Sequence, residues 1–187
     1  MTTLWTIGHS NHPIEKFVGL LNAQGIGSIA DVRRFPGSRR HPQFGADQLR
    51  ESLATAGIEY RHFAGLGGRR GKPSADSPNT GWRVASFNAY ADYMNTEAFL
   101  ADLQALISLA RTRRVAVMCS EALPWRCHRR LIADALSVRG LQVLDIVGSG
   151  SPREHVLTPF AQLIGDRLIY PPTAEEGAAS EMTDQTS

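Results

Sequence analysis

Apolar residues fall into two patterns that alternate along the chain. Some form short unbroken runs, which are typical of strands buried on both faces of a sheet. Others recur every three or four positions, which is typical of helices with one buried face. The unbroken runs predict five strands, at residues 4–7, 26–32, 58–63, 115–119 and 141–147.

The periodic stretches predict helices between these strands. Pro13 suits a first helical turn, so Asn11 or His12 is the expected cap of the first helix, and Pro124 is the expected start of a later one. Three helices are followed by a glycine stop signal, at Gly25, Gly57 or Gly140. Further helices are predicted through Leu49 and Leu53, at residues 87–94, from Asn95 or Thr96 to Ala110, and at residues 158–164, with residues 168–170 extended.

Strands that alternate with helices predict right-handed crossovers. The expected fold is therefore α/β, a Rossmann-like three-layer arrangement with a mainly parallel sheet of about five strands and helices on both faces. Residues 1–172 are predicted to form this single domain. The polar, glycine-rich interval 64–86 is long for a loop, which favours a functional or mobile segment such as a lid.

The 187-residue chain has a formal charge of +2, but the charge is unevenly distributed. Nine Lys and Arg residues against three acidic residues fall between Arg33 and Lys72. Residues 173–187 contain four acidic residues and no Lys or Arg, which predicts a flexible acidic tail. A basic body fits an anionic substrate such as a nucleotide or nucleic acid, although a scattered solvated surface has the same composition.

The sequence also limits where the protein works. No window of about 18 apolar residues is present, which excludes a membrane span, and the first residues do not resemble a secretory signal. Cys119 and Cys127 are the only cysteines, too few for a disulfide framework. A cytoplasmic protein is therefore expected.

Polar residues follow four of the predicted strands, so a parallel sheet would bring them to one edge, where ligands bind. Glu121 and Asp31 are expected to divide acid–base work, while His9 or His128 hydrogen-bonds the reacting group. Each residue also has a structural alternative, as a helix cap, an ion-pair partner or a core residue. The predicted catalytic residues are His9, Asp31, Cys119, Glu121 and His128.

Arginines near this edge are candidates for binding phosphate, because a guanidinium group matches its geometry. Arg69 and Arg70 belong to a glycine-rich stretch that lacks the Walker spacing and is interpreted as a cationic lid. The helix start after Asn11 would add backbone donors. The predicted substrate-binding residues are Asn11, Arg33, Arg39, Arg40, Arg69, Arg70 and Arg126.

The cysteines offer a different chemistry. Cys119 is either a small core residue or a thiolate whose pKa the following helix start and nearby arginines lower. Six residues separate it from Arg126, a spacing that differs from the cysteine phosphatase signature. Cys119, Cys127 and His128 could hold a metal ion, but their spacing matches none of the usual zinc patterns, and no cofactor is predicted.

Several blocks of the sequence occur in the order of a known family. They are residues 6–11, Asp31-Val32-Arg33 followed by Pro36 and Ser38-Arg39, Leu66-Gly67-Gly68, and Met118-Cys119-Ser120-Glu121 followed by Cys127-His128-Arg129. Over about residues 4–160 the chain resembles the bacterial and archaeal proteins grouped as domain of unknown function 488. The resemblance implies a single α/β domain and no particular reaction. The positions that match the motifs are His9, Asp31, Arg33, Cys119, Glu121 and His128.

The leading hypothesis is a hydrolase-type enzyme that acts on a phosphate-bearing substrate, a nucleotide or nucleic acid. Hydrolysis is the default reaction because no glycine spacing fits a dinucleotide turn. One alternative is a non-catalytic nucleic-acid-binding module that uses the same arginines. The other is a thiol- or metal-dependent enzyme centred on Cys119.

Overall fold

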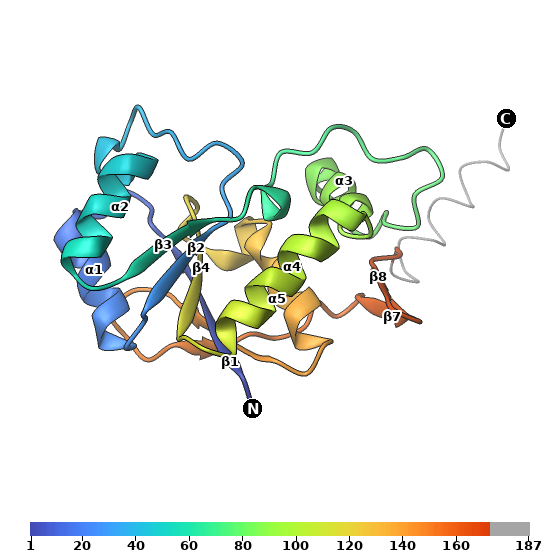
Figure 1. Ribbon diagram of the computed structural model, residues 1–187. Coiled ribbons are helices and arrows are strands. Elements are labelled where there is room, and N and C mark those ends of the chain that lie inside the picture. The colour runs from blue at the N-terminus through green and yellow to red at the C-terminus, as the bar shows by residue number, and fades with distance from the viewer. Residues whose placement is uncertain (173–187) are drawn as a thin grey trace, which may run out of the picture. The chain divides into compact units, whose positions relative to one another are not determined.

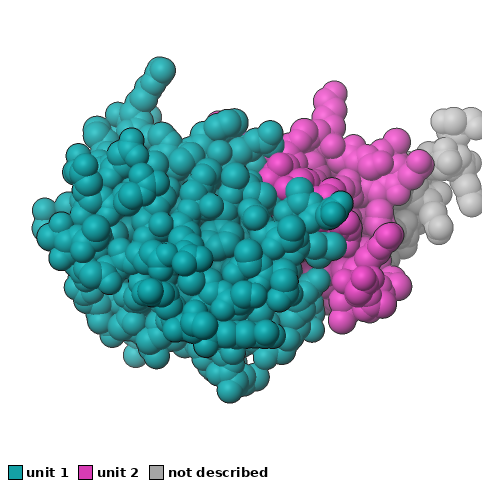
Figure 2. Space-filling view, viewed as in Figure 1, with its two compact units in different colours: residues 1–68, 97–156 teal, residues 69–96, 157–187 magenta. Residues whose placement is uncertain are grey.

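The structure is a computed structural model that describes residues 1–172 (Figure 1). These residues form two compact units, which have separate colours in Figure 2. Unit 1 comprises residues 1–68 and 97–156, and unit 2 comprises residues 69–96 and the segment from Leu157 onward. A single domain over residues 1–172 stays a prediction, and the predicted acidic tail, 173–187, lies outside the described residues.

Unit 1 is built on a six-stranded sheet that contains all five predicted strands. The strand order is β3-β2-β4-β1-β5-β6, and the first five strands are parallel. The sixth strand, which the sequence did not predict, pairs with β5 in antiparallel orientation. The predicted α/β class and mainly parallel sheet are therefore confirmed. The bounds are β1 (Thr3–Gly8), β2 (Ser28–Asp31), β3 (Glu59–His62), β4 (Val115–Cys119), β5 (Gln142–Ile146) and β6 (Arg153–Glu154).

Helices cover both faces of this sheet. The connections β1→β2 and β2→β3 run in one direction along the sheet, whereas β3→β4 and β4→β5 run in the other. Right-handed crossovers therefore put α1 (Ile14–Ala23) and α2 (Ala46–Thr55) on one face, and α4 (Glu97–Ala110) and α5 (Arg129–Ser137) on the other. Phe17 and Leu49 of the first pair share a core with Ile29 of β2, all three fully buried.

The same strand order creates a topological switch between β4 and β1, because the connections that follow these neighbouring strands run in opposite directions. Open α/β sheets bind ligands in the crevice at such a point, beyond the carboxyl ends of the strands. The candidate site is therefore expected where β1 and β4 end.

Three local predictions are wrong. The helix expected from Pro124 begins only at Arg129, because a 3-10 turn, η3 (Pro124–Arg126), and an extended Cys127 precede it. The helix expected at residues 158–164 is absent: strands β7 (Gln162–Ile164) and β8 (Arg167–Ile169) form a hairpin there, and Gly165 supplies the positive φ of its turn. Neither residue proposed as the cap of α1 has that role, since the N-cap is Pro13 and no side chain of the described residues caps it.

Unit 2 contains α3 (Ala85–Tyr93) and the β7–β8 hairpin. The Asp92 carboxylate orders the loop before α3 by accepting hydrogen bonds from the Ser74 backbone N–H, the Ser77 hydroxyl and the Asn79 amide. Asn79 in turn accepts a hydrogen bond from the Tyr170 backbone N–H at 2.9 Å. Much of the interval 64–86 is thus ordered by side-chain contacts, and its role as a lid stays a prediction.

None of the helices within residues 1–172 is both long enough and apolar enough to cross a membrane. This finding agrees with the absence of a long apolar window in the sequence.

A buried charge cluster in unit 1 fixes the segment after β6 to the sheet. His155 Nε2 donates to Asp134 Oδ1 of α5 at 2.8 Å, and His155 Nδ1 lies 3.6 Å from Asp145 Oδ2 of β5. Asp145 also accepts a hydrogen bond from the Thr6 hydroxyl of β1 at 2.5 Å. Burial alone would lower the pKa of His155, but hydrogen bonds to the two aspartates raise it to about 9. The imidazole is therefore charged at neutral pH.

We expect the free energy of unfolding to fall as the pH rises through about 9. The folded state binds the His155 proton more tightly than the unfolded state, so this contribution is complete below pH ~6.5 and is lost above the folded pKa. A pKa difference of this size corresponds to about 3 kcal/mol.

Urea unfolding at several pH values will test this expectation. The wild-type protein should lose stability between about pH 6.5 and pH 10, and His155→Gln should be less stable at the lower pH and lose less across the interval. Parallel pH profiles for the two proteins would contradict a shifted His155.

Candidate functional site

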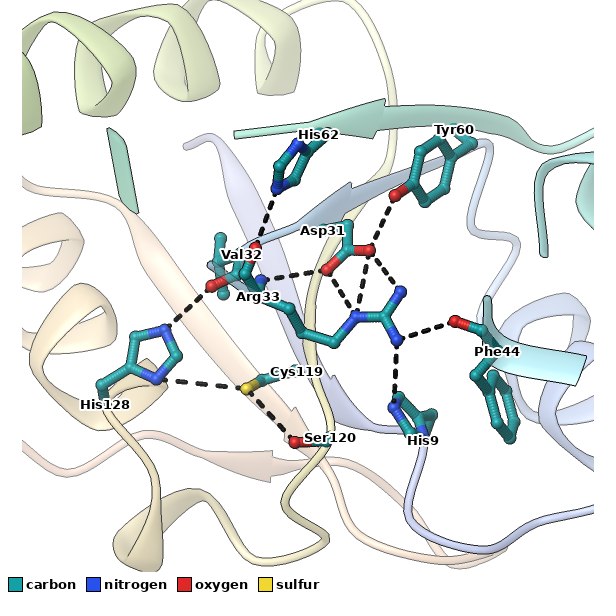
Figure 3. A network of polar contacts seen from close by, with 10 residues as sticks. All are labelled: His9, Asp31, Val32, Arg33, Phe44, Tyr60, His62, Cys119, Ser120 and His128. Atoms are coloured by element: carbon teal, nitrogen blue, oxygen red, sulfur yellow. Dashed lines mark hydrogen bonds and ion pairs between the residues drawn. The ribbon is translucent and has the colours of Figure 1, made fainter. Parts of the chain in front are cut away.

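The candidate site lies at the carboxyl ends of β1, β2 and β4 (Figure 3). The parallel ladder continues past the first and last of these strands, since the His9 N–H donates to the Cys119 carbonyl at 2.9 Å. Gly8 permits this close approach, because a Cβ atom there would lie 1.9 Å from the Glu121 carbonyl oxygen. The structure thus places the segments that carry His9, Asp31 and Cys119 side by side.

A buried ion pair occupies the β2 side of the site. Arg33 Nη2 lies 2.6 Å from Asp31 Oδ2 and Arg33 Nε lies 2.9 Å from Asp31 Oδ1, with 6% and 0% of the two side chains exposed. Arg33 Nη1 donates to the Phe44 carbonyl at 2.7 Å, and the Tyr60 hydroxyl donates to Asp31 Oδ2 at 2.8 Å. Burial, followed by the Asp31 charge, raises the pKa of Tyr60, which therefore keeps its proton.

These contacts bear on the roles predicted for Asp31 and Arg33. A guanidinium group that already donates to a carboxylate and a carbonyl has few donors left for a phosphate. A carboxylate with no exposed surface, held by Arg33 and Tyr60, is poorly placed to move a substrate proton. Their roles in acid–base catalysis and phosphate binding stay predictions, and the geometry favours positioning.

His9 is held against this pair as a neutral imidazole. Its Nδ1 lies 2.8 Å from the Ser10 carbonyl, which can only accept, so the proton is on Nδ1 and Nε2 faces Arg33 Nη1 at 3.4 Å. The ring stacks on Phe44 with centroids 4.1 Å apart. Burial, with smaller contributions from the charges of Arg33 and His41, lowers the pKa of His9 to about 4. His9 is thus suited to positioning Arg33 at neutral pH.

A second cluster faces this pair across the carboxyl end of β4, and it brings both cysteines to His128. Cys119 ends β4, Cys127 lies in extended backbone, and His128 is the N-cap residue of α5. His128 Nδ1 lies 3.7 Å from Cys127 Sγ and 4.0 Å from Cys119 Sγ. His128 Nε2 lies 3.1 Å from the Val32 carbonyl, which can only accept, so Nε2 donates to it and Nδ1 faces the sulfur atoms.

Arg129 is buried behind Cys127, with 1% of its surface exposed. Its Nε donates to Cys127 Sγ at 3.5 Å, and Nη2 donates to the Glu121 carbonyl at 2.5 Å. Among residues 1–172, no carboxylate pairs with Arg129, and its Nη1 has no hydrogen-bond partner. A buried cation requires a counter-charge. The Cys127 sulfur is the group in contact with Arg129 that can supply one.

The two cysteines have opposite protonation preferences. The hydrogen bond from Cys119 and the charge of Arg129 lower the pKa of Cys127 to about 6, although burial acts in the other direction. The hydrogen bond to Cys127, together with burial, raises the pKa of Cys119 to about 12. The contact of Cys127 with Arg129 thus favours the ionised form of Cys127, and the environment of Cys119 favours its protonated form.

The same three side chains are close enough to share a metal ion. The two sulfur atoms and one nitrogen of His128 lie within 4.8 Å of one another. A soft divalent ion would, however, be neutralised by two thiolates and would leave buried Arg129 without a counter-charge. The charges thus favour a metal-free thiolate, and the absence of a cofactor stays a prediction.

Among the other predicted site residues, Glu121 contributes its backbone carbonyl, which accepts the hydrogen bond from Arg129, and not its side chain. Glu121 is exposed, and its carboxylate accepts a hydrogen bond from the Ala122 N–H at 3.1 Å. Arg69 and Arg70 belong to unit 2, where the Arg70 guanidinium stacks on the Tyr93 ring at 3.4 Å. The roles predicted for all of them stay predictions. The remaining members of the set are exposed residues of unit 1: Asn11, Arg39, Arg40 and Arg126.

Sequence reasoning missed three residues that shape the site: Phe44, Tyr60 and Arg129. Phe44 and Tyr60 reach it through tertiary packing, which leaves no local signal in the sequence. Arg129 could have been found, because it directly follows His128 in a recognised sequence block. Gly68, which belongs to another of these blocks, leaves room for the His128 ring, since a Cβ atom at position 68 would lie 2.9 Å from His128 Nδ1.

Residues 13–136 match the family described as "Domain of unknown function DUF488". No curated protein and no solved structure matches the chain. The matched range includes Asp31, Arg33 and the cluster of Cys119, Cys127 and His128.

We expect His9 to titrate far below an ordinary histidine, because protonation would place a charge in a buried space beside Arg33. A histidine NMR titration will show its midpoint at a pH of about 4, with His155 as an internal contrast near 9. His9→Gln identifies the resonance. The unfolded state takes up this proton first, so the folded protein should lose stability as the pH falls from about 6.5 to 4. A His9 midpoint at or above pH ~6.5 would refute the buried neutral state.

Proposed function

The chain belongs to the DUF488 family, and from its site we propose that it is a thiol-dependent enzyme whose reactive group is the Cys127 thiolate. The Cys119 thiol and the His128 imidazole are the groups that assist this thiolate. The strand order also supports the proposal. Cys119 ends β4 and Cys127 lies on the connection that follows it, and the carboxyl end of β4 is at the topological switch. An electrophilic substrate would bind beyond the carboxyl ends of β1 and β4, where open α/β sheets bind their ligands.

The contact between Arg129 and Cys127 carries the proposal. Burying a guanidinium group without an anion costs several kcal/mol, so a fold that keeps Arg129 1% exposed needs a negative partner. A thiol that becomes a thiolate in contact with Arg129 meets this need and is at the same time the nucleophilic form of cysteine. Structural stability and reactivity therefore demand the same ionised state of Cys127.

His128 and Cys119 complete the chemistry. The Val32 carbonyl fixes the orientation of the His128 ring, and Nδ1 then faces both sulfur atoms. In this position Nδ1 can accept the Cys119 proton or return a proton to a leaving group. Cys119 Sγ lies within 4.8 Å of Cys127 Sγ, close enough for the Cys119 thiol to stabilise a negative charge on Cys127.

The geometry supports the remaining hypotheses less well. An acid–base hydrolase that uses Asp31 and Glu121 would need one carboxylate that Arg33 and Tyr60 already hold and another that is exposed. A phosphate-bearing substrate or a nucleic acid remains compatible with the exposed arginines Arg39, Arg40 and Arg126. Within residues 1–172, no contact of these three arginines adds support for a phosphate-bearing substrate or for a nucleic acid.

Alkylation with iodoacetamide tests the thiolate directly. We expect Cys127 to react at neutral pH with a midpoint well below that of a free thiol, whose pKa is about 8.5, and Cys119 to react slowly. Replacing Arg129 by Met should slow alkylation of Cys127 at neutral pH at least about tenfold, because the thiolate loses its counter-charge. Mass spectrometry of peptides separates the two cysteines.

The matched control is Arg139→Met, which removes an exposed guanidinium just beyond the other end of α5 and touches neither cysteine. Arg129→Lys serves as a second variant if the Met variant fails to fold, since it retains the charge. Alkylation of Cys127 with an ordinary thiol midpoint, or stoichiometric zinc in the protein purified without chelator, would overturn the proposal. An activity that survives Cys127→Ser in a panel of ester, disulfide and peroxide substrates would overturn it as well.

A further inference from the structure

The two sulfur atoms of unit 1 are neighbours. Cys119 Sγ, Cys127 Sγ and a ring nitrogen of His128 lie within 4.8 Å of one another, so each thiol is the nearest possible reaction partner of the other. Cys119 is fixed at the end of β4, whereas Cys127 lies between η3 and α5 in extended backbone with φ −132° and ψ 147°. The Cys127 backbone is held by two hydrogen bonds, from its own N–H to the Pro124 carbonyl and from the Arg130 N–H to its carbonyl. Bond formation therefore requires rotation of the two cysteine side chains together with a small shift of this segment.

The two thiols differ in the way that stepwise disulfide chemistry requires. Cys127 contacts Arg129 and is the ionised, attacking sulfur, whereas Cys119 retains its proton until a base removes it. His128 Nδ1 lies 4.0 Å from Cys119 Sγ and is the base in reach. One sulfur is thus prepared to react first and the other to react second.

Burial limits what can reach the pair. Cys119 and Cys127 expose 7% and 4% of their surfaces, so a disulfide within a peptide or a protein partner has poor access to either sulfur atom. An oxidant of two heavy atoms is far less restricted. The chemistry of the pair and its access therefore select a small oxidant.

We propose that this site reduces hydrogen peroxide or a similarly small hydroperoxide, with Cys127 as the attacking sulfur and Cys119 as the resolving sulfur. The inference rests on the proposed function, because it uses the same thiolate, and it adds the substrate class and the second cysteine. The product state of the protein is a Cys119–Cys127 disulfide.

The reaction balances in two steps. The Cys127 thiolate attacks one peroxide oxygen, the O–O bond breaks, and with one proton the products are a Cys127 sulfenic acid and water. His128 Nδ1 then takes the Cys119 proton, Cys119 sulfur attacks Cys127 sulfur, and hydroxide leaves as water after it receives that proton. Two thiols and one peroxide thus give one disulfide and two waters. A thiol reductant returns the pair to its starting state.

The experiment uses the full chain and hydrogen peroxide itself. Because Cys119 and Cys127 are the only cysteines, every thiol signal belongs to the pair. One equivalent of peroxide should consume both thiols together and lower the mass by about 2 Da, and dithiothreitol should reverse the change. In Cys119→Ser, the Cys127 sulfenic acid should accumulate and be trapped by a cyclic 1,3-diketone.

The controls separate this inference from the proposed function. Cys127→Ser should consume peroxide at least about tenfold more slowly than the wild type, and Arg129→Met should slow the first step while Arg139→Met does not. If Cys127 is alkylated rapidly at neutral pH but peroxide yields no disulfide, the inference is wrong and the reactive thiolate stands. Failure of both reactions overturns both, as does equal oxidation of Cys119→Ser and Cys127→Ser. Should Arg129→Met not fold, Arg129→Lys and the two serine variants decide the question.

Discussion

A buried guanidinium without a carboxylate is the constraint on which the site depends. Arg129 is fixed by backbone carbonyls after β4 and by Cys127, so it orders the segment that joins this strand to α5. That segment carries Cys127 and His128, and Cys119 is the last residue of the strand before it. If Arg129 were paired with an aspartate, Cys127 would have no reason to ionise and would be an ordinary core cysteine. Whether Cys127 is a reactive thiolate or an ordinary core cysteine therefore depends on which group neutralises Arg129.

The same edge of the sheet contains the opposite case in Arg33. Its guanidinium has a carboxylate partner, Asp31, and its remaining contacts are a carbonyl and the His9 ring. Two arginines of similar burial thus have different partners, because Arg33 is neutralised by a carboxylate whereas Arg129 contacts the sulfur atom that we propose to be a thiolate. The Asp31–Arg33 pair is fixed at this edge of the sheet, because Tyr60 donates a hydrogen bond to Asp31 and His9 contacts Arg33.

The sequence predicted the fold well because the signals for it are local. Unbroken apolar runs identified all five parallel strands, and periodic apolar positions with glycine stops identified most helices. Crossover rules limit the possible strand orders but do not determine the order on their own. The α-helix predicted from Pro124 was wrong because a proline starts a 3-10 turn as readily as an α-helix, and here it starts η3. Convergence of residues at the strand ends was predictable for the same topological reason. The contacts of each side chain were not predictable from the sequence, because packing decides them. Packing pairs Arg33 with Asp31 rather than with a ligand, and it places Arg129 against a sulfur atom rather than a carboxylate.

The choice of Cys127 over Cys119 as the ionised thiol follows from these partnerships. Arg33 lies close enough to Cys119 to interact with it electrostatically, and an unpaired Arg33 would favour a thiolate there. Asp31 removes that possibility by neutralising Arg33, so the uncompensated positive charge of the cysteine cluster is Arg129, on the side of Cys127. Burial and the neighbouring Cys127 raise the pKa of Cys119, which favours its protonated form. In the proposed thiol chemistry, the buried Asp31–Arg33 pair at the end of β2 would act without contacting a substrate, because neutralising Arg33 favours the negative charge on Cys127 over Cys119.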